Sequence, residues 1–144
     1  MVVEPDGAPA DEEAVLAANR AFYAAFEARD MDAMSDVWEH SERSACVHPG
    51  WGRLNGWAAI SASWFALFQN GQHLQFIITN ERADVALGGQ VAWVSCDENI
   101  LADEVGGTVA AVNLFVRDAG EGPSRSSRWR LVLHHGSTVA ARPD

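Results

Sequence analysis

The chain has 144 residues, of which 48% are hydrophobic and 21% charged, and its formal net charge is -10. This length and apolar content suit one folded domain and exclude disordered and disulfide-dependent classes. The acidic charge disfavours nucleic acid as a partner, and because all ten basic residues are Arg, Schiff-base and P-loop lysines are excluded.

No apolar run approaches the roughly 18 to 20 residues of a membrane span. The acidic start also lacks the basic region that opens a signal peptide. Cys46 and Cys96 lie far apart with no CxxC spacing, which favours two reduced, buried thiols. We therefore expect a cytoplasmic protein without a membrane partner.

Helical spacing dominates the first half of the chain. Residues 1–10, rich in Pro and Gly, are predicted to be a flexible tail. Asp11 is expected to cap a first helix and Asp30 a second, shorter one. A third amphipathic helix is expected to end at Asn70 and Gly71. The apolar positions of the three are Val15, Ala18, Phe22 and Phe26; Met34, Val37 and Trp38; and Trp57, Ile60, Trp64, Leu67 and Phe68.

Strand-like patterns occupy the rest. A short strand over 44–48 is stopped by Pro49 and Gly50. From Gln72 the apolar period falls to two, and strands are predicted there and over 91–100, 108–117 and 128–137, separated by Gly-containing turns. Helices followed by an antiparallel meander predict an α+β fold whose sheet packs one face on the helices. Six Trp and six Phe indicate either an aromatic-lined pocket or simply a large aromatic core.

Several segments carry a family resemblance. The segments AFYAAFEARDMDAM, ACVHPGWGRLNGWAAISASWFALF, VNLFVRD and WRLVLHHGS, in this order, resemble the SnoaL-like branch of the nuclear transport factor 2-like, ketosteroid-isomerase-like superfamily. The resemblance covers residues 11–138 and leaves 139–144 as a C-terminal tail. It implies a conical α+β fold in which a bent antiparallel sheet wraps three helices around a pocket. Homodimerisation through the outer sheet face is also implied.

The resemblance also suggests catalytic positions. His48, before Pro49, stands where ketosteroid isomerases carry a catalytic Asp, and imidazole suits acid and base duty at neutral pH. The oxyanion-hole Asp corresponds to Asn113, whose amide can donate to an oxyanion. The oxyanion-hole Tyr corresponds to Phe22, with Tyr23 one step around the helix. Each of these polar groups has an alternative role as a locally satisfied buried group.

Adjacent polar pairs in the late strands must face opposite sides. His135 is expected to face inward, on a face with Trp129, Leu131 and Leu133, and to assist Asn113. His134 is then expected on the outer face. Of Asp97 and Glu98, either can pair with an imidazole if buried, but the default expectation is exposure.

Aromatic residues complete the predicted site. Trp51 is expected to cover the mouth of the pocket, while Trp64, Phe68 and Phe115 line it together with Phe22, Tyr23 and Glu98. For Trp64 and Phe68 the alternative is plain core packing. No metal-ligand spacing is present, so neither metal nor cofactor is expected.

Two functions fit these residues. One is a cofactor-independent acid/base isomerase, cyclase or dehydratase in which His48 moves a proton next to the carbonyl of an apolar small molecule. The other is a non-catalytic ligand-binding or association domain. The residues that depart from the isomerase pattern favour the second, whereas the concentration of polar groups favours the first.

Overall fold

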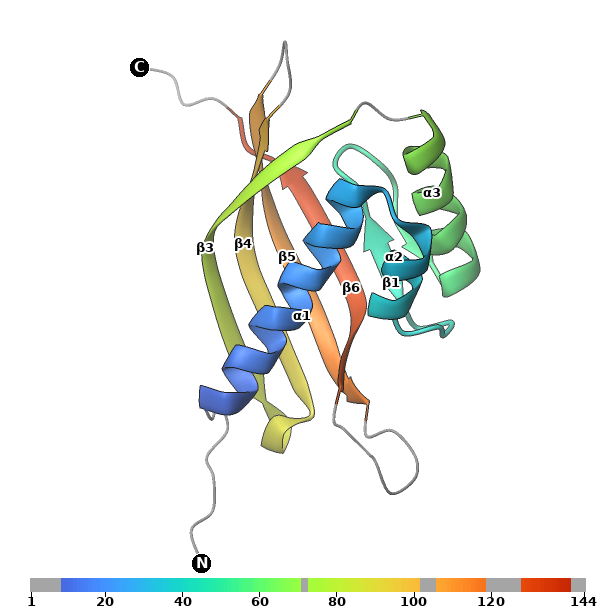
Figure 1. Ribbon diagram of the computed structural model, residues 1–144. Coiled ribbons are helices and arrows are strands. Elements are labelled where there is room, and N and C mark those ends of the chain that lie inside the picture. Colours follow the sequence, from blue (N-terminus) through green and yellow to red (C-terminus); the bar gives the residue numbers. More distant parts are fainter. Residues whose placement is uncertain (1–8, 71–72, 102–105, 119–127, 141–144) are drawn as a thin grey trace, which may run out of the picture.

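Three helices and one six-stranded sheet make up the protein (Figure 1). The computed structural model describes residues 9–70, 73–101, 106–118 and 128–140. The elements are α1 (Pro9–Ala28), α2 (Met31–Val37), β1 (Ala45–Val47), β2 (Leu54–Asn55), α3 (Trp57–Asn70), β3 (Gln75–Ala86), the 3-10 turn η1 (Leu87–Gly89), β4 (Val91–Leu101), β5 (Gly107–Asp118) and β6 (Arg128–Thr138).

The sheet has the strand order β2-β1-β6-β5-β4-β3. All neighbouring strands are antiparallel except β1 and β6, which are parallel. In Figure 1, α1 crosses one face of the bent sheet, and α2 and α3 lie toward the edge that carries β1. The predicted α+β class is therefore confirmed. None of the helices within the described ranges combines the length and hydrophobicity needed to span a membrane.

The ends of the predicted elements need one correction. Helix α1 begins at Pro9, not at Asp11, because proline is well suited to the first turn of a helix. Asp11 instead lies inside that turn and pairs with Arg117 of β5. The expected tail over 1–10 is thus wrong for Pro9 and Ala10, and residues 1–8 lie outside the described part. The second cap is confirmed, since the Asp30 carboxylate accepts a hydrogen bond from the Ala33 amide at 3.0 Å.

At the other end of the chain, the predicted tail over 139–144 is only partly described. Val139 and Ala140 follow β6 outside any regular element, and the Val139 amide donates to the Thr108 carbonyl at 2.9 Å. Residues 141–144 lie outside the described ranges.

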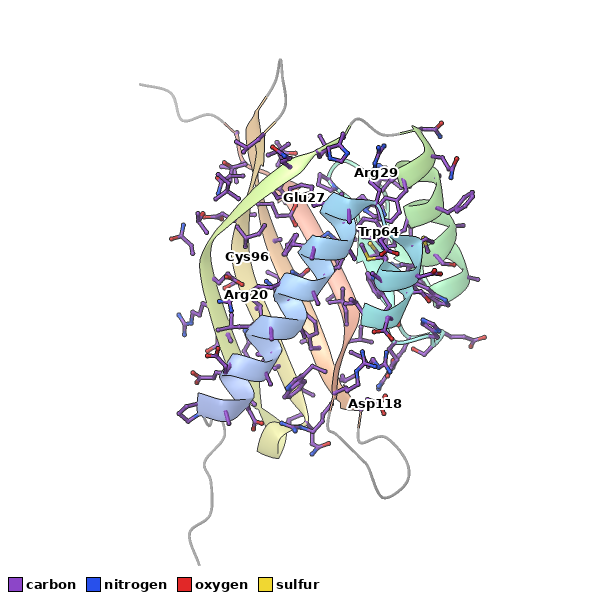
Figure 2. The ribbon with its side chains drawn as sticks, in the orientation of Figure 1. Arg20, Glu27, Arg29, Trp64, Cys96 and Asp118 are labelled. Carbon is purple, nitrogen blue, oxygen red and sulfur yellow. The ribbon has the colours of Figure 1, made fainter. Side chains whose placement is uncertain are left out.

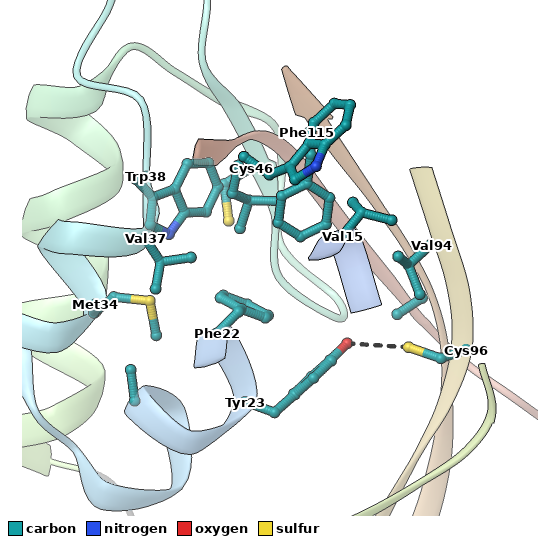
Figure 3. Close-up of a cluster of buried hydrophobic side chains, with 14 of the residues drawn as sticks. Val15, Phe22, Tyr23, Met34, Val37, Trp38, Cys46, Val94, Cys96 and Phe115 are labelled. Carbon is teal, nitrogen blue, oxygen red and sulfur yellow. Dashed lines mark hydrogen bonds between the residues drawn. The ribbon is translucent and has the colours of Figure 1, made fainter. Parts of the chain in front are cut away.

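The core fills the space between the helices and the sheet (Figure 3). Phe22 is fully buried, and its ring makes edge contacts with Trp38 and Trp64 at centroid distances of 6.4 and 5.6 Å. Phe26 contacts Trp64 in the same way at 4.8 Å. Such contacts add about 0.5 to 1.5 kcal/mol each beyond area burial. The aromatic stripe of α3 is therefore integrated into the core.

A β-bulge in β6 determines which histidine enters this interior. Phe115 of β5 is opposite Leu131 and Asn113 is opposite His134, so three residues of β5 (113–115) match four of β6 (131–134). The extra residue reverses the alternation of faces from that point onward. His134 is consequently buried and His135 exposed on the outer face, so the predicted orientation of the two histidines is wrong.

Candidate functional site

Polar side chains are concentrated inside this apolar core. We call them the polar row: they come from α1, the end of β1, α3 and the three last strands, and each is 6% exposed or less. The row consists of Asn19, Tyr23, His48, Ser63, Glu98, Asn113 and His134. Buried polar groups of this kind must be hydrogen-bonded to each other, because water does not reach them.

Glu98 and Tyr23 form one end of the polar row. The Tyr23 hydroxyl donates to Glu98 Oε2 at 2.6 Å. It also lies 3.5 Å from the Cys96 sulfur (Figure 3). Strand β4 alternates strictly, with Val94, Cys96 and Glu98 inward. The default expectation that Glu98 is exposed is therefore wrong, because the tyrosine supplies the donor that makes its burial tolerable. Its partner is this phenol, not an imidazole.

Asn113 links Tyr23 to His134. Its amide nitrogen donates to Asn19 Oδ1 at 2.8 Å and to the Tyr23 hydroxyl at 3.1 Å, which uses both amide hydrogens. Its oxygen lies 2.6 Å from His134 Nδ1 and can only accept. His134 must therefore carry its proton on Nδ1, which leaves Nε2 as the basic atom.

His48 and Ser63 form the other end of the polar row. The Ser63 hydroxyl donates to the Ile60 carbonyl at 2.6 Å, so it accepts from His48 Nε2 at 2.9 Å. His48 Nδ1 is then the basic atom, and the Cys46 sulfur lies 3.9 Å from Nδ1 and 3.7 Å from Nε2. The ring centres of His48 and His134 are 6.4 Å apart. Two basic imidazole nitrogens thus belong to one buried site.

Burial sets the protonation of these groups. It lowers the pKa of His48 to about 4 and that of His134 to about 3, so both rings are neutral at pH 7. Burial raises the pKa of Glu98 to about 7, against the lowering effect of the Tyr23 hydrogen bond. It also raises the pKa of Tyr23 far above its usual range, with the nearby Glu98 as a second cause. Near pH 7, Glu98 is therefore about half ionised, while the two imidazoles and the phenol are neutral.

The other predicted site residues lie in three kinds of environment. Phe22, Phe115 and Trp64 are fully buried core residues, and Trp64 lies between α1 and α3 (Figure 2). Phe68 is half-buried at the margin of that core. Trp51 is 44% exposed, and its ring makes an edge contact with the His48 ring at a centroid distance of 4.8 Å.

His135 lies away from this interior. It lines a hollow of about 460 Å³ on the outer face of the sheet, next to Val112 and Ser137. It is therefore separated from Asn113, which it was expected to assist. Among the residues that the structure describes, no cluster of three or more His, Cys, Asp or Glu side chains is arranged to hold a metal ion.

The sequence interpretation missed three members of the polar row, Asn19, Ser63 and His134. Asn19 lies four residues before Tyr23 and hence on the same face of α1, a signal that was available. Ser63 lies next to Trp64 on a helix with no charged side chain and gives no comparable signal. His134 was misassigned because alternation alone does not reveal a bulge.

Comparison with known proteins agrees with this architecture. A family model described as a SnoaL-like domain matches residues 15–141. The chain belongs to this SnoaL-like family. A protein of the NTF2-like family from Streptomyces avermitilis, named as a candidate dehydratase, is 34% identical to this SnoaL-like chain. The match covers 92% of this chain and 99% of that one, with a TM-score of 0.78.

Other relatives of the SnoaL-like chain carry different names. A structure from Thiobacillus denitrificans, named as a candidate association domain of calcium/calmodulin-dependent protein kinase type II, is 31% identical. It covers 97% of this chain and 100% of that one, with a TM-score of 0.74. The F-box protein SKIP8 of Arabidopsis thaliana is 25% identical over 130 residues, 90% of this chain. This chain spans about half the length of that relative, 52%.

Proposed function

We propose that the protein is a cofactor-independent acid/base enzyme that isomerises, cyclises or dehydrates an uncharged, apolar carbonyl compound. The observation that carries this proposal is the polar row, which places two neutral imidazoles, a phenol and a carboxyl group within one apolar core. Burying titratable groups lowers stability, so such a concentration is typical of a functional site. The relative named as a candidate dehydratase supports the same class.

His48 is the proposed base. Its Nδ1 removes the proton from the carbon next to the carbonyl and the imidazole becomes a cation. Because burial lowers the pKa of His48 to about 4, this cation readily returns its proton. Returning it to another carbon completes an isomerisation, and returning it to a departing hydroxyl releases water and completes a dehydration.

Asn113 and His134 have supporting roles in this proposal. Both hydrogens of the Asn113 amide are used on Asn19 and Tyr23, so it positions the row and is not itself the oxyanion donor expected from the sequence. His134 replaces His135 as the second imidazole of the site, 6.4 Å from His48.

The test is proton exchange with solvent. In deuterated buffer, the wild-type protein should speed the exchange of α-protons in members of a panel of neutral cyclic ketones, measured by NMR. His48→Gln, which keeps a donor for Ser63, should lose this effect by about 100-fold or more. His40→Ala removes an exposed imidazole that stacks on Trp57 and is the matched control. Equal exchange by the wild type and His48→Gln would overturn the proposal.

A second candidate function is association between copies of the chain. Apolar side chains are exposed on the outer sheet face, with Ile77 52% and Val112 45% exposed. The relative named as a candidate association domain matches 97% of this chain. We propose that a homodimer forms through this face. Sedimentation should then give a dimer for the wild type and for the control Phe65→Arg on α3, but a monomer for Val112→Arg.

A further inference from the structure

Two buried indole N–H groups have no hydrogen-bond acceptor in the described part of the chain, those of Trp38 and Trp64. A buried donor without an acceptor costs folding free energy, because it has given up its bond to water. Trp38 packs on Phe22 and Trp57. Trp64, in contrast, lies against His48 with ring centres 4.7 Å apart and planes at 88°. The indole ring that carries this unused donor is therefore in contact with the proposed base.

The other donors of the polar row are already used. His48 donates to Ser63 and His134 to Asn113. Asn113 donates to Asn19 and Tyr23, and Tyr23 donates to Glu98. Of the two unused indole donors, Trp64 is the one whose ring contacts His48, so it is the N–H that a ligand oxygen beside the base can use; an indole nitrogen can donate and cannot accept.

We propose that the Trp64 indole N–H holds the carbonyl oxygen of the ligand and thereby sets which carbon faces His48. The inference rests on the proposed function, because it concerns the ligand of the same site. It also specifies the class of ligand. The row contains no Arg that would pair with a carboxylate, and Glu98 would repel one, so the oxygen is that of a ketone or other uncharged carbonyl.

The loop after β1 offers the route of entry. His48 is 3% exposed, and the half-exposed ring of Trp51 rests on it. The loop turns through Gly50 at a φ of +83°, and the Trp51 amide donates to the His48 carbonyl at 2.9 Å. A Cβ added at Gly50 or at Gly52 would meet no atom within 4 Å apart from the chain neighbours. The half-exposed Trp51 ring is therefore the part of this loop that lies between the base and solvent.

The experiment compares two probes of the same shape. The ketone 2-acetylnaphthalene carries a carbonyl oxygen, and 2-ethylnaphthalene has none. Indole proton–nitrogen correlation spectra report on all six Trp side chains, with assignments from Trp64→Phe and Trp38→Phe. We expect the ketone to move the Trp64 indole proton downfield, to leave Trp38 unchanged, and to bind about tenfold more tightly than the hydrocarbon.

The matched variants decide the result. Trp64→Phe should remove the tenfold preference for the ketone, and Trp38→Phe, which deletes the other unused donor, should keep it. Equal effects of the two probes on Trp64, or no effect of the ketone on it up to the solubility limit, would overturn the inference. Catalysis is judged separately by the exchange assay. A ketone held by Trp64 without exchange would refute the proposed enzyme and leave the binding inference standing.

Discussion

Replacing Glu98 by Gln should make the protein more stable at alkaline pH and should do so in a pH-dependent way. Glu98 is 2% exposed, and burial raises its pKa from 4.5 to about 7. Between these values the unfolded chain has released the proton that the folded chain keeps. The contribution of Glu98 to stability is therefore lost as pH rises from 4.5 to 7 and stays low above pH 7.

The size of this effect follows from the shift in pKa. At about 1.4 kcal/mol per pKa unit, a rise from 4.5 to about 7 corresponds to about 3 kcal/mol. In Glu98→Gln the amide oxygen still accepts from the Tyr23 hydroxyl, but the charge is gone. The stability of the variant relative to the wild type should then increase by about 3 kcal/mol between pH 4.5 and pH 8.

Urea unfolding followed by Trp fluorescence measures this difference across the pH range. Contributions from the histidines are common to both proteins and cancel in the comparison. Repeating the series in about 1 M salt is the control, because the cost of burying a charge is not screened as surface interactions are. A stability difference that does not change with pH would refute the assignment of Glu98 as a buried carboxyl group that keeps its proton up to about pH 7.

Two further predictions concern stability. Burial lowers the pKa of His48 to about 4 and that of His134 to about 3, so wild-type stability should fall as pH drops below 6.5. His48 alone should account for about 3 kcal/mol of this loss at pH 4. In His48→Gln, the free energy of unfolding measured in urea should fall less steeply as the pH is lowered. Gly136→Ala should destabilise by about 1 to 3 kcal/mol, since the new Cβ would lie 3.0 Å from Val109 and 3.3 Å from Pro49. Gly52→Ala, with open space, is its control, and equal melting temperatures of the two variants would contradict this packing.

Much of the fold follows from local patterns in the sequence. The cap at Asp30 and the end of the third helix at Asn70 depend on residues within one turn, and both were predictable. The inward face of β5 was also predictable, because Asn113 and Phe115 follow strict alternation. Alternation likewise placed Cys46 and His48 on one face, and both are buried.

The remaining features depend on contacts between distant segments. The bulge opposite Phe115 reverses the faces of β6, and no local residue pattern marks it, so His134 was assigned to the wrong side. The burial of Glu98 depends on Tyr23, which is 75 residues away in the chain. Phe22 packs in the core, whereas the next residue, Tyr23, reaches the site. Which of these two neighbours faces the site depends on how α1 is rotated against the sheet.

The most direct measurement is a pH titration of the histidine side-chain nitrogens by NMR, with His48 assigned through His48→Gln. The structure predicts an apparent pKa of about 4 for His48, with the proton on Nε2 at neutral pH and on Nδ1 for His134. This result would establish two buried, neutral bases with their free nitrogens as described. A His48 pKa near 6.5, or a proton on its Nδ1, would contradict the account, because the ring would then be solvated or would turn its basic atom toward Ser63.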